Sequence, residues 1–222
     1  KGCPNHYLKR NMGSLQTRLC KLLGDFSGCL FRQGPTNLAD GRYDYMLGNY
    51  QILLADADGQ TLFSLIFMDS GEKGKKGDGR HATFTDSQVA WYEWLVNGTN
   101  ADAGKTVKSM AFFHIPLPQY ALAADAAGRD SVEGLEESIY VGKRDSGLFD
   151  SMKRLGSTVA TFCGHDHENT FALDYEGLKL CYGGSAGYTT HGRAKFKCVR
   201  IVELDVFEER FTTEILFEKE LD

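Results

Sequence analysis

The sequence predicts an α/β domain built around a mixed sheet, and three observations indicate this fold class. In the first two thirds of the chain, segments with helical spacing of apolar residues alternate with short apolar runs typical of buried strands. The last third contains several short strand-like runs separated by turn residues, which is typical of antiparallel strands. The chain has 222 residues, enough to bury a core, and we expect residues 1–222 to form a single domain.

The composition excludes several classes of partner. The chain has 25 Lys and Arg against 30 Asp and Glu, and no basic stripe runs along any segment, so we expect no nucleic-acid partner. No apolar run is long enough to span a membrane, and no signal-peptide pattern precedes the fold. No two cysteines form a C-x-x-C pair, and those at 163, 181 and 198 lie in apolar runs. We therefore expect these three to be buried, and the compartment, although open, leans toward a reducing, cytoplasmic one.

The first elements are a helix and a hairpin. Residues 14–23 place four leucines on one helical face. Residues 49–56 and 61–69 have the pattern of two strands, and Asp58-Gly59 between them is a turn signal. The segment 71–79 is rich in glycine and charge, so we expect a loop there.

A second helix and a central strand follow. Thr85 and Gln88 have the spacing of a capping box at the start of a helix over 85–96. The segment 107–115 is a strand rich in aromatic residues, and it stops at Pro116, which cannot donate to a ladder.

The remaining elements are one helix and five strands. We expect a short helix over 146–156, closed by Gly156, and a buried strand over 157–163. The later strands are predicted over 170–175, 178–183, 195–206 and 210–220.

Three histidines stand just beyond the ends of predicted strands. His114 ends one strand before a turn stiffened by proline, and His165 and His167 follow another in the motif G-H-x-H. Ligand sites in α/β proteins gather at the carboxyl ends of strands, and imidazole is a common metal ligand. A single histidine in such a place is more often structural, but three favour a metal site. Gly164 allows the backbone to bend close to an ion.

Two other motifs point to different chemistry. Residues 183–187 match G-x-S-x-G, which would make Ser185 the nucleophile of a serine hydrolase. That motif should lead into a helix, yet a polar loop and strands follow, with His191 too close and no acid before it. The Gly-Lys-Thr at 104–106 lacks the earlier glycine of a phosphate-binding loop, so we discard it.

The stretches AFFHIPLPQY and TFCGHDHENTF resemble the calcineurin-like metallophosphoesterases, and most closely their purple-acid-phosphatase-related branch. The segments FMDSGEKG, SQVAWYEWL and SGLFDSMKRLG fit that branch as well. The resemblance runs from residue 5 to about residue 205. It implies a sandwich of α/β/β/α layers and two divalent metal ions (Fe, Zn or Mn) that clamp a phosphate-ester substrate while a metal-activated water attacks phosphorus.

The resemblance also implies a role for individual residues. His114 and His165 would bind the second metal together with Asn5, from what resembles the family's G-N-H block. His167 would bind the first metal, and His6 would be the catalytic proton donor or charge stabiliser near the ester.

The family's D-x-H block, and a G-D block ahead of the N-H block, are not found in this chain. They supply most ligands of the first metal, so we expect an N-terminally truncated version of the fold with weak or no activity by itself. A catalytically dead phosphoesterase-like binding domain is the alternative. A missing part of the sheet would leave an edge open, and we expect self-association there. The loops at 71–84 and 121–145 are expected to shape the pocket.

Overall fold

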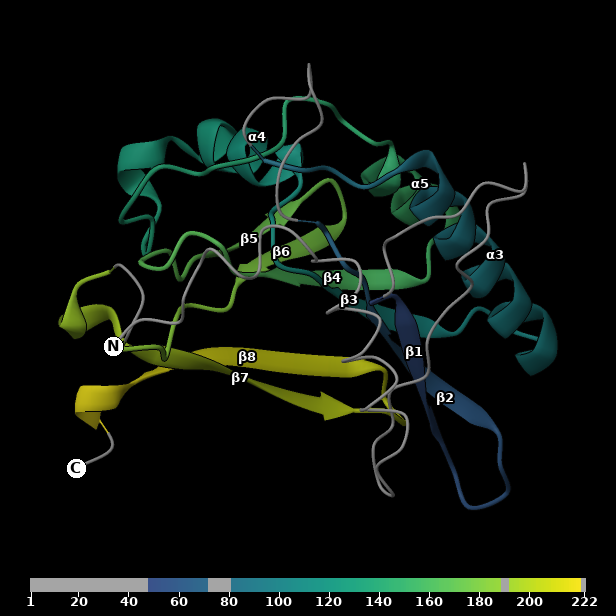
Figure 1. The fold of residues 1–222 in the computed structure, drawn as a ribbon. Helices are drawn as coiled ribbons and strands as arrows, with labels where there is room; N and C mark the ends of the chain where they lie inside the picture. The colour runs from purple at the N-terminus through teal and green to yellow at the C-terminus, as the bar shows by residue number, and fades with distance from the viewer. Residues whose placement is uncertain (1–47, 72–80, 189–191, 221–222) are drawn as a thin grey trace, which may run out of the picture.

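A six-stranded mixed sheet forms the centre of the fold, as a computed structural model of the chain shows (Figure 1). The structure describes residues 48–71, 81–188 and 192–220. The predicted helix at 14–23, together with Asn5 and His6, lies outside the described residues. The mixed α/β class is confirmed, whereas the single domain over 1–222 stays a prediction.

The sheet has the strand order β1-β2-β3-β4-β6-β5. Its four central strands are parallel to one another, and the two edge strands, β1 and β5, are antiparallel to their neighbours. The strands are β1 (Tyr50–Ala55), β2 (Thr61–Phe67), β3 (Lys108–Phe112), β4 (Thr158–Cys163), β5 (Ala172–Tyr175) and β6 (Leu178–Tyr182). Because the central strands run the same way, their carboxyl ends meet at one edge of the domain.

Three α-helices cover one face of this sheet, and a separate hairpin covers the other (Figure 1). The helices are α3 (Asp86–Ala103), α4 (Pro118–Ala127) and α5 (Leu148–Leu155). The hairpin pairs β7 (Cys198–Asp205) with β8 (Arg210–Phe217). Short 3₁₀ turns lie at Arg129–Ser131, Ala194–Phe196 and Glu218–Glu220. Of the four predicted layers, three are therefore seen, and the residues that the structure describes include no α-helix beyond the hairpin.

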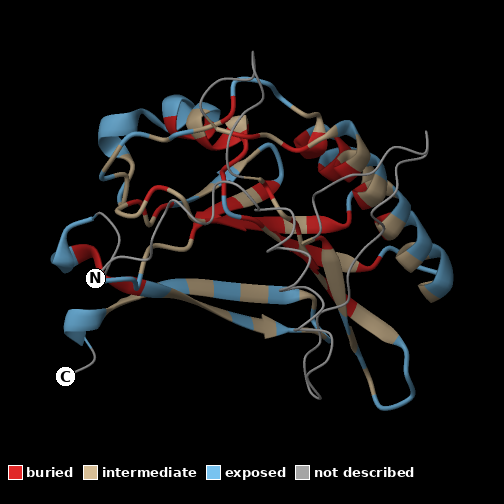
Figure 2. Ribbon diagram, in the orientation of Figure 1, coloured by how far each residue is buried: buried red, intermediate tan, exposed pale blue. Residues whose placement is uncertain are grey.

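Alternate residues of the central strands supply two apolar cores. In β3, Ala111 faces the helices and Met110 faces the hairpin. The larger core lies under the helices and includes the buried rings of Tyr92, Tyr120 and Phe149. Figure 2 shows the buried residues concentrated in the central strands and on the inner sides of the helices. This double-sided burial explains why the central strands are nearly continuous apolar runs.

Local signals in the sequence account for the starts and ends of the helices. The capping box is confirmed: the Thr85 side chain accepts the backbone N–H of Gln88, and the Gln88 side chain accepts that of Thr85. Helix α3 runs on to Ala103, beyond the predicted end at 96, and Gly104 closes it in the left-handed conformation. Gly156 ends α5 in the same way, as predicted.

Helix α4 differs from the sequence-based expectation of a loop over 121–145, with which it overlaps from residue 121 to residue 127. Pro118 at its first turn was the available signal. The expectation for the cysteines at 163, 181 and 198 is confirmed, since all three are free and buried. No helix within the described ranges is long and apolar enough to cross a membrane.

Candidate functional site

The parallel pairing of β3 and β4 brings His114 next to the G-H-D-H turn. Phe112 pairs with Phe162, and two residues further on the backbone N–H of Gly164 donates to the carbonyl of His114 at 3.0 Å. The strand register therefore sets the separation between the two histidine segments. The sequence-based expectation that strand ends gather these residues matches this arrangement.

His114 and His165 lie with their rings edge to face. Nδ1 of His165 is 3.3 Å from Nε2 of His114, and the ring centroids are 5.1 Å apart. His165 has a backbone φ of 74°, in the left-handed region that side chains other than glycine seldom adopt. Such a conformation costs free energy and is found most often at functional sites, where the surrounding structure maintains it.

His81 is a third member of this cluster, and it lies outside the two histidine motifs of the sequence. Its Nδ1 is 3.0 Å from Nε2 of His165, and the two rings are edge to face with centroids 4.6 Å apart. His165 therefore lies between His114 and His81, with one ring nitrogen toward each. No motif surrounds His81, so its position could be found only from the folded chain.

The fourth histidine, His167, acts on the pKa of His114 through its charge. The pKa of His114 is lowered, first because the surrounding protein withdraws part of its ring from water, although the residue keeps an exposed edge. The charge of His167 lowers it further, and Asp69 acts in the opposite direction. The neutral form of His114, which is the form that binds metals, is thus favoured.

Asp166 lies between the two histidines of the motif, and its buried side chain holds the turn in place. Its residue is only 2% exposed, and its carboxylate accepts hydrogen bonds from the Tyr182 hydroxyl and the backbone N–H of Tyr140. Burial is the main cause that raises the pKa of Asp166, to about 6. The histidines therefore extend from a turn whose central side chain is fixed in the protein interior.

Further contacts join this turn to the loop before α5. The Asn169 side chain accepts the backbone N–H groups of Glu136 and Glu137. In return, a carboxylate oxygen of Glu137 accepts the backbone N–H of Glu168 at 2.7 Å. The part of the 121–145 region that follows α4 is thus attached directly to the histidine turn, and the role of this region in shaping a pocket stays a prediction.

The donor set fits a metal ion in part. An ion held by two imidazoles at about 2.0–2.1 Å in a tetrahedral arrangement keeps their nitrogens about 3.3 Å apart. The 3.3 Å between His114 and His165 matches this spacing. Throughout the described segments, however, no three His, Cys, Asp or Glu side chains are arranged to hold one ion. Two imidazoles with the spacing of ligands to one ion are therefore present here, and the metal-binding or catalytic roles of Asn5, His6, His114, His165 and His167 stay predictions.

The region of Ser185 does not have the form of a nucleophile elbow. Ser185 follows β6, but the chain continues into a loop, and the next element is the 3₁₀ turn Ala194–Phe196. Its carbonyl accepts the backbone N–H of Cys198, and it forms a bridge with Lys197. These contacts give Ser185 a structural role beside the hairpin.

Comparison with known proteins gives relatives that are named phosphatases or inactive phosphatases. No family model matches the chain. It is 28% identical to probable inactive purple acid phosphatase 28 of Arabidopsis thaliana, over 75% of this chain and 43% of that protein. It is 31% identical to probable inactive purple acid phosphatase 14 of the same plant, over 70% of this chain and 42% of that protein. The chain thus spans less than half the length of these relatives.

A solved structure of a dimetal phosphatase from Danio rerio is a more distant match. It is 13% identical, with a TM-score of 0.44, over 77% of this chain and 55% of that one.

Proposed function

Because the chain is related in sequence to the purple-acid-phosphatase-like proteins, we propose that it carries a metal site of the phosphoester-hydrolase type and acts on phosphate esters. The observation that supports this most is the pairing of His114 with His165. Their ring nitrogens stand 3.3 Å apart at the carboxyl ends of adjacent parallel strands.

In this proposal His114 and His165 hold one divalent ion, and Asn5 completes its set. His167 holds the first ion, and His6 donates a proton to the leaving group or stabilises charge near the ester. A bound divalent ion supplies polarisation of the phosphoryl oxygen and an acidified water. The protein positions the ligands: the strand register fixes His114, and the Asp166 anchor fixes the turn that carries the other two.

A second candidate is a phosphoesterase-like domain that binds without turnover. Two observations favour it: several relatives are named inactive, and no carboxylate joins the histidine pair in a three-ligand group within the described ranges. Neutral ligands alone hold a dication less well than a set with a carboxylate. For the chain by itself we therefore propose weak or no turnover.

The test is release of 4-nitrophenol from its phosphate mono- and diesters, with Mn²⁺, Zn²⁺ or Fe²⁺ added and with a chelator as blank. Slow, metal-dependent release that His165→Ala and His114→Ala remove would support the hydrolase. Metal binding without release would favour the binding domain. Ser185→Ala is the matched control, and loss of release in that variant alone would point to serine chemistry instead.

A further inference from the structure

We propose that His81 is a positioning residue for the histidine pair: its Nδ1 accepts the Nε2–H of His165 and so leaves the lone pair on Nδ1 of His165 directed toward His114. This inference rests on the proposed metal site and deepens it. It assigns a role to a side chain that lies outside both motifs of the family resemblance.

The hydrogen-bond geometry supports the assignment. A neutral imidazole has one donor nitrogen and one acceptor nitrogen, so a bond at one of them decides the state of the other. Nε2 of His165 is 3.0 Å from His81, and its Nδ1 is 3.3 Å from His114. If Nε2 carries the proton, Nδ1 is the nitrogen that can bind an ion between His165 and His114. Metal-binding histidines generally donate their second ring N–H to a fixed acceptor in this manner.

His81 is itself fixed, because the chain just after it is attached to the segment before α5. Ala82 is buried, and Gly142 comes so close that a Cβ there would lie 2.8 Å from the Ala82 carbonyl oxygen. The ring of Tyr140, 5.8 Å away between centroids, lies tilted against that of His81.

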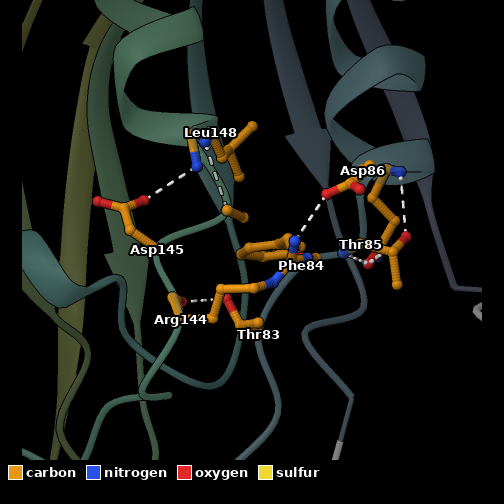
Figure 3. A network of polar contacts seen from close by, with 10 residues as sticks. Thr83, Phe84, Thr85, Asp86, Arg144, Asp145 and Leu148 are labelled. Atoms are coloured by element: carbon orange, nitrogen blue, oxygen red, sulfur yellow. Dashed lines mark hydrogen bonds and ion pairs between the residues drawn. The ribbon is translucent and has the colours of Figure 1, made fainter. Parts of the chain in front are cut away.

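Arg144 provides a further attachment. Its guanidinium donates to the Phe84 carbonyl at 3.0 Å and to the Asp86 carboxylate at 2.8 Å. Its own carbonyl accepts the Thr83 hydroxyl at 3.0 Å. Figure 3 shows Arg144 beside Thr83, with dashed lines that join Arg144 to Thr83 and to Asp86. An imidazole that begins such an anchored segment can act as a fixed acceptor.

Without its acceptor, the Nε2–H tautomer of His165 would lose the hydrogen bond that favours it. The ring of His165 contacts one histidine at each of its nitrogens, at 3.0 Å and 3.3 Å, so loss of the His81 contact removes one of the two. Loss of an outer partner of this kind typically weakens metal affinity about 10- to 100-fold. We expect that loss for a variant of His81 that keeps a ring but has no acceptor.

Two measurements test the proposal on the full chain. The first is ¹⁵N NMR of the histidine rings in the metal-free protein, which reports the protonated nitrogen of each imidazole. The second is the Kd for Zn²⁺ from calorimetry for the wild type, His81→Phe and His81→Asn. Phe keeps a flat ring without an acceptor, whereas the Asn oxygen can stand near the position of Nδ1. Tyr140→Phe, which alters the neighbouring ring only at its hydroxyl, is the matched control.

The expected result is a proton on Nε2 of His165, a Kd raised about 10- to 100-fold in His81→Phe, and recovery of most of that loss in His81→Asn. A proton on Nδ1 of His165 would overturn the proposal. So would a Kd in His81→Phe equal to that of the control. The NMR result needs no variant and stands even if His81→Phe fails to fold. If Zn²⁺ binding is insensitive to His165→Ala, the proposed metal site fails, and the NMR result still decides the role of His81.

Discussion

The hydroxyl of Tyr182, the last residue of β6, donates a hydrogen bond to the carboxylate of Asp166 in the histidine turn. The carboxylate also accepts the backbone N–H of Tyr140 at 3.1 Å, so one buried acid joins three segments of the chain. Both ends of the Tyr182–Asp166 contact are withdrawn from water, and burial raises the pKa of Tyr182 as well.

The first prediction concerns the pH dependence of stability in the metal-free protein. The pKa of Asp166 is about 6 in the folded state, above its ordinary value near 4. Between those values the folded state binds more protons than the unfolded state, so stability falls as pH rises. The contribution of Asp166 is present below about pH 4 and is lost as pH rises through about 6, by up to about 3 kcal/mol. Asp166→Asn should remove this part of the slope.

Urea unfolding with a chelator present, at about pH 4 and about pH 7, measures the slope for each protein. Asp58→Asn is the control, because Asp58 is exposed in the β1–β2 turn and should leave the slope close to wild type. Equal slopes in the wild type and Asp166→Asn would contradict the prediction.

The second prediction contrasts two glycines. A Cβ on residue 142 would lie 2.8 Å from the Ala82 carbonyl oxygen, so Gly142→Ala forces the segment after His81 to move. We expect a loss of about 1–3 kcal/mol of unfolding free energy. Gly98, inside α3, has open space around it, so Gly98→Ala should stabilise the protein by about 0.5–1 kcal/mol. Denaturant unfolding measures the stability of both variants. If Gly142→Ala and Gly98→Ala changed the unfolding free energy in the same direction, the steric explanation for Gly142 would be wrong.

Much of the fold could be predicted because its signals are local. The turn at Asp58-Gly59, the capping box at Thr85 and the glycine at 156 each act within a few residues. The end of α3 was misplaced, since Asn97 and Gly98 are typical of helix ends yet are tolerated here inside a helix of 18 residues. Contacts of the added turns offset that local preference: the Thr99 hydroxyl accepts the Gln51 side-chain amide, and the Asn100 side chain accepts the backbone N–H of Val107.

The third prediction concerns self-association, which stays untested. In the part of the chain that the structure describes, β1 is an edge strand of the sheet, and Leu53 on it is 47% exposed. An exposed apolar edge favours pairing with another chain, and a charge there opposes it. Sedimentation velocity over a range of concentrations should show a dimer fraction that Leu53→Lys lowers. Thr106→Ala, at an exposed site outside the strands, is the control. A wild-type protein that stays monomeric at all concentrations would end this proposal.

The sequence predicts only those histidines of the site that follow two strands paired with each other in the sheet. His114 and His165 follow strands that pair with each other, so strand ends and spacing were sufficient to associate them. His81 reaches the same place from a segment that precedes α3, and its position depends on contacts with residues 142–144, about sixty residues away. No local pattern encodes such a contact, because it is set by the packing of the loop before α5.

The last prediction compares alanine with glycine at position 165, in order to separate the effect of backbone strain on stability from the loss of the imidazole. Both His165→Ala and His165→Gly remove the imidazole, and we expect both to lose Zn²⁺ affinity to a similar degree. At a φ of 74°, alanine retains the left-handed strain and glycine relieves it, so His165→Gly should be more stable than His165→Ala by about 1 kcal/mol. His167 is not among the described residues with positive φ, so there glycine should be less stable than alanine by about 0.4–1 kcal/mol. Urea unfolding of the four variants in chelator tests this reversal of sign. If glycine is the less stable residue at both positions, the conformation of His165 is unstrained in the metal-free protein, and its unusual φ gives no support to a functional role.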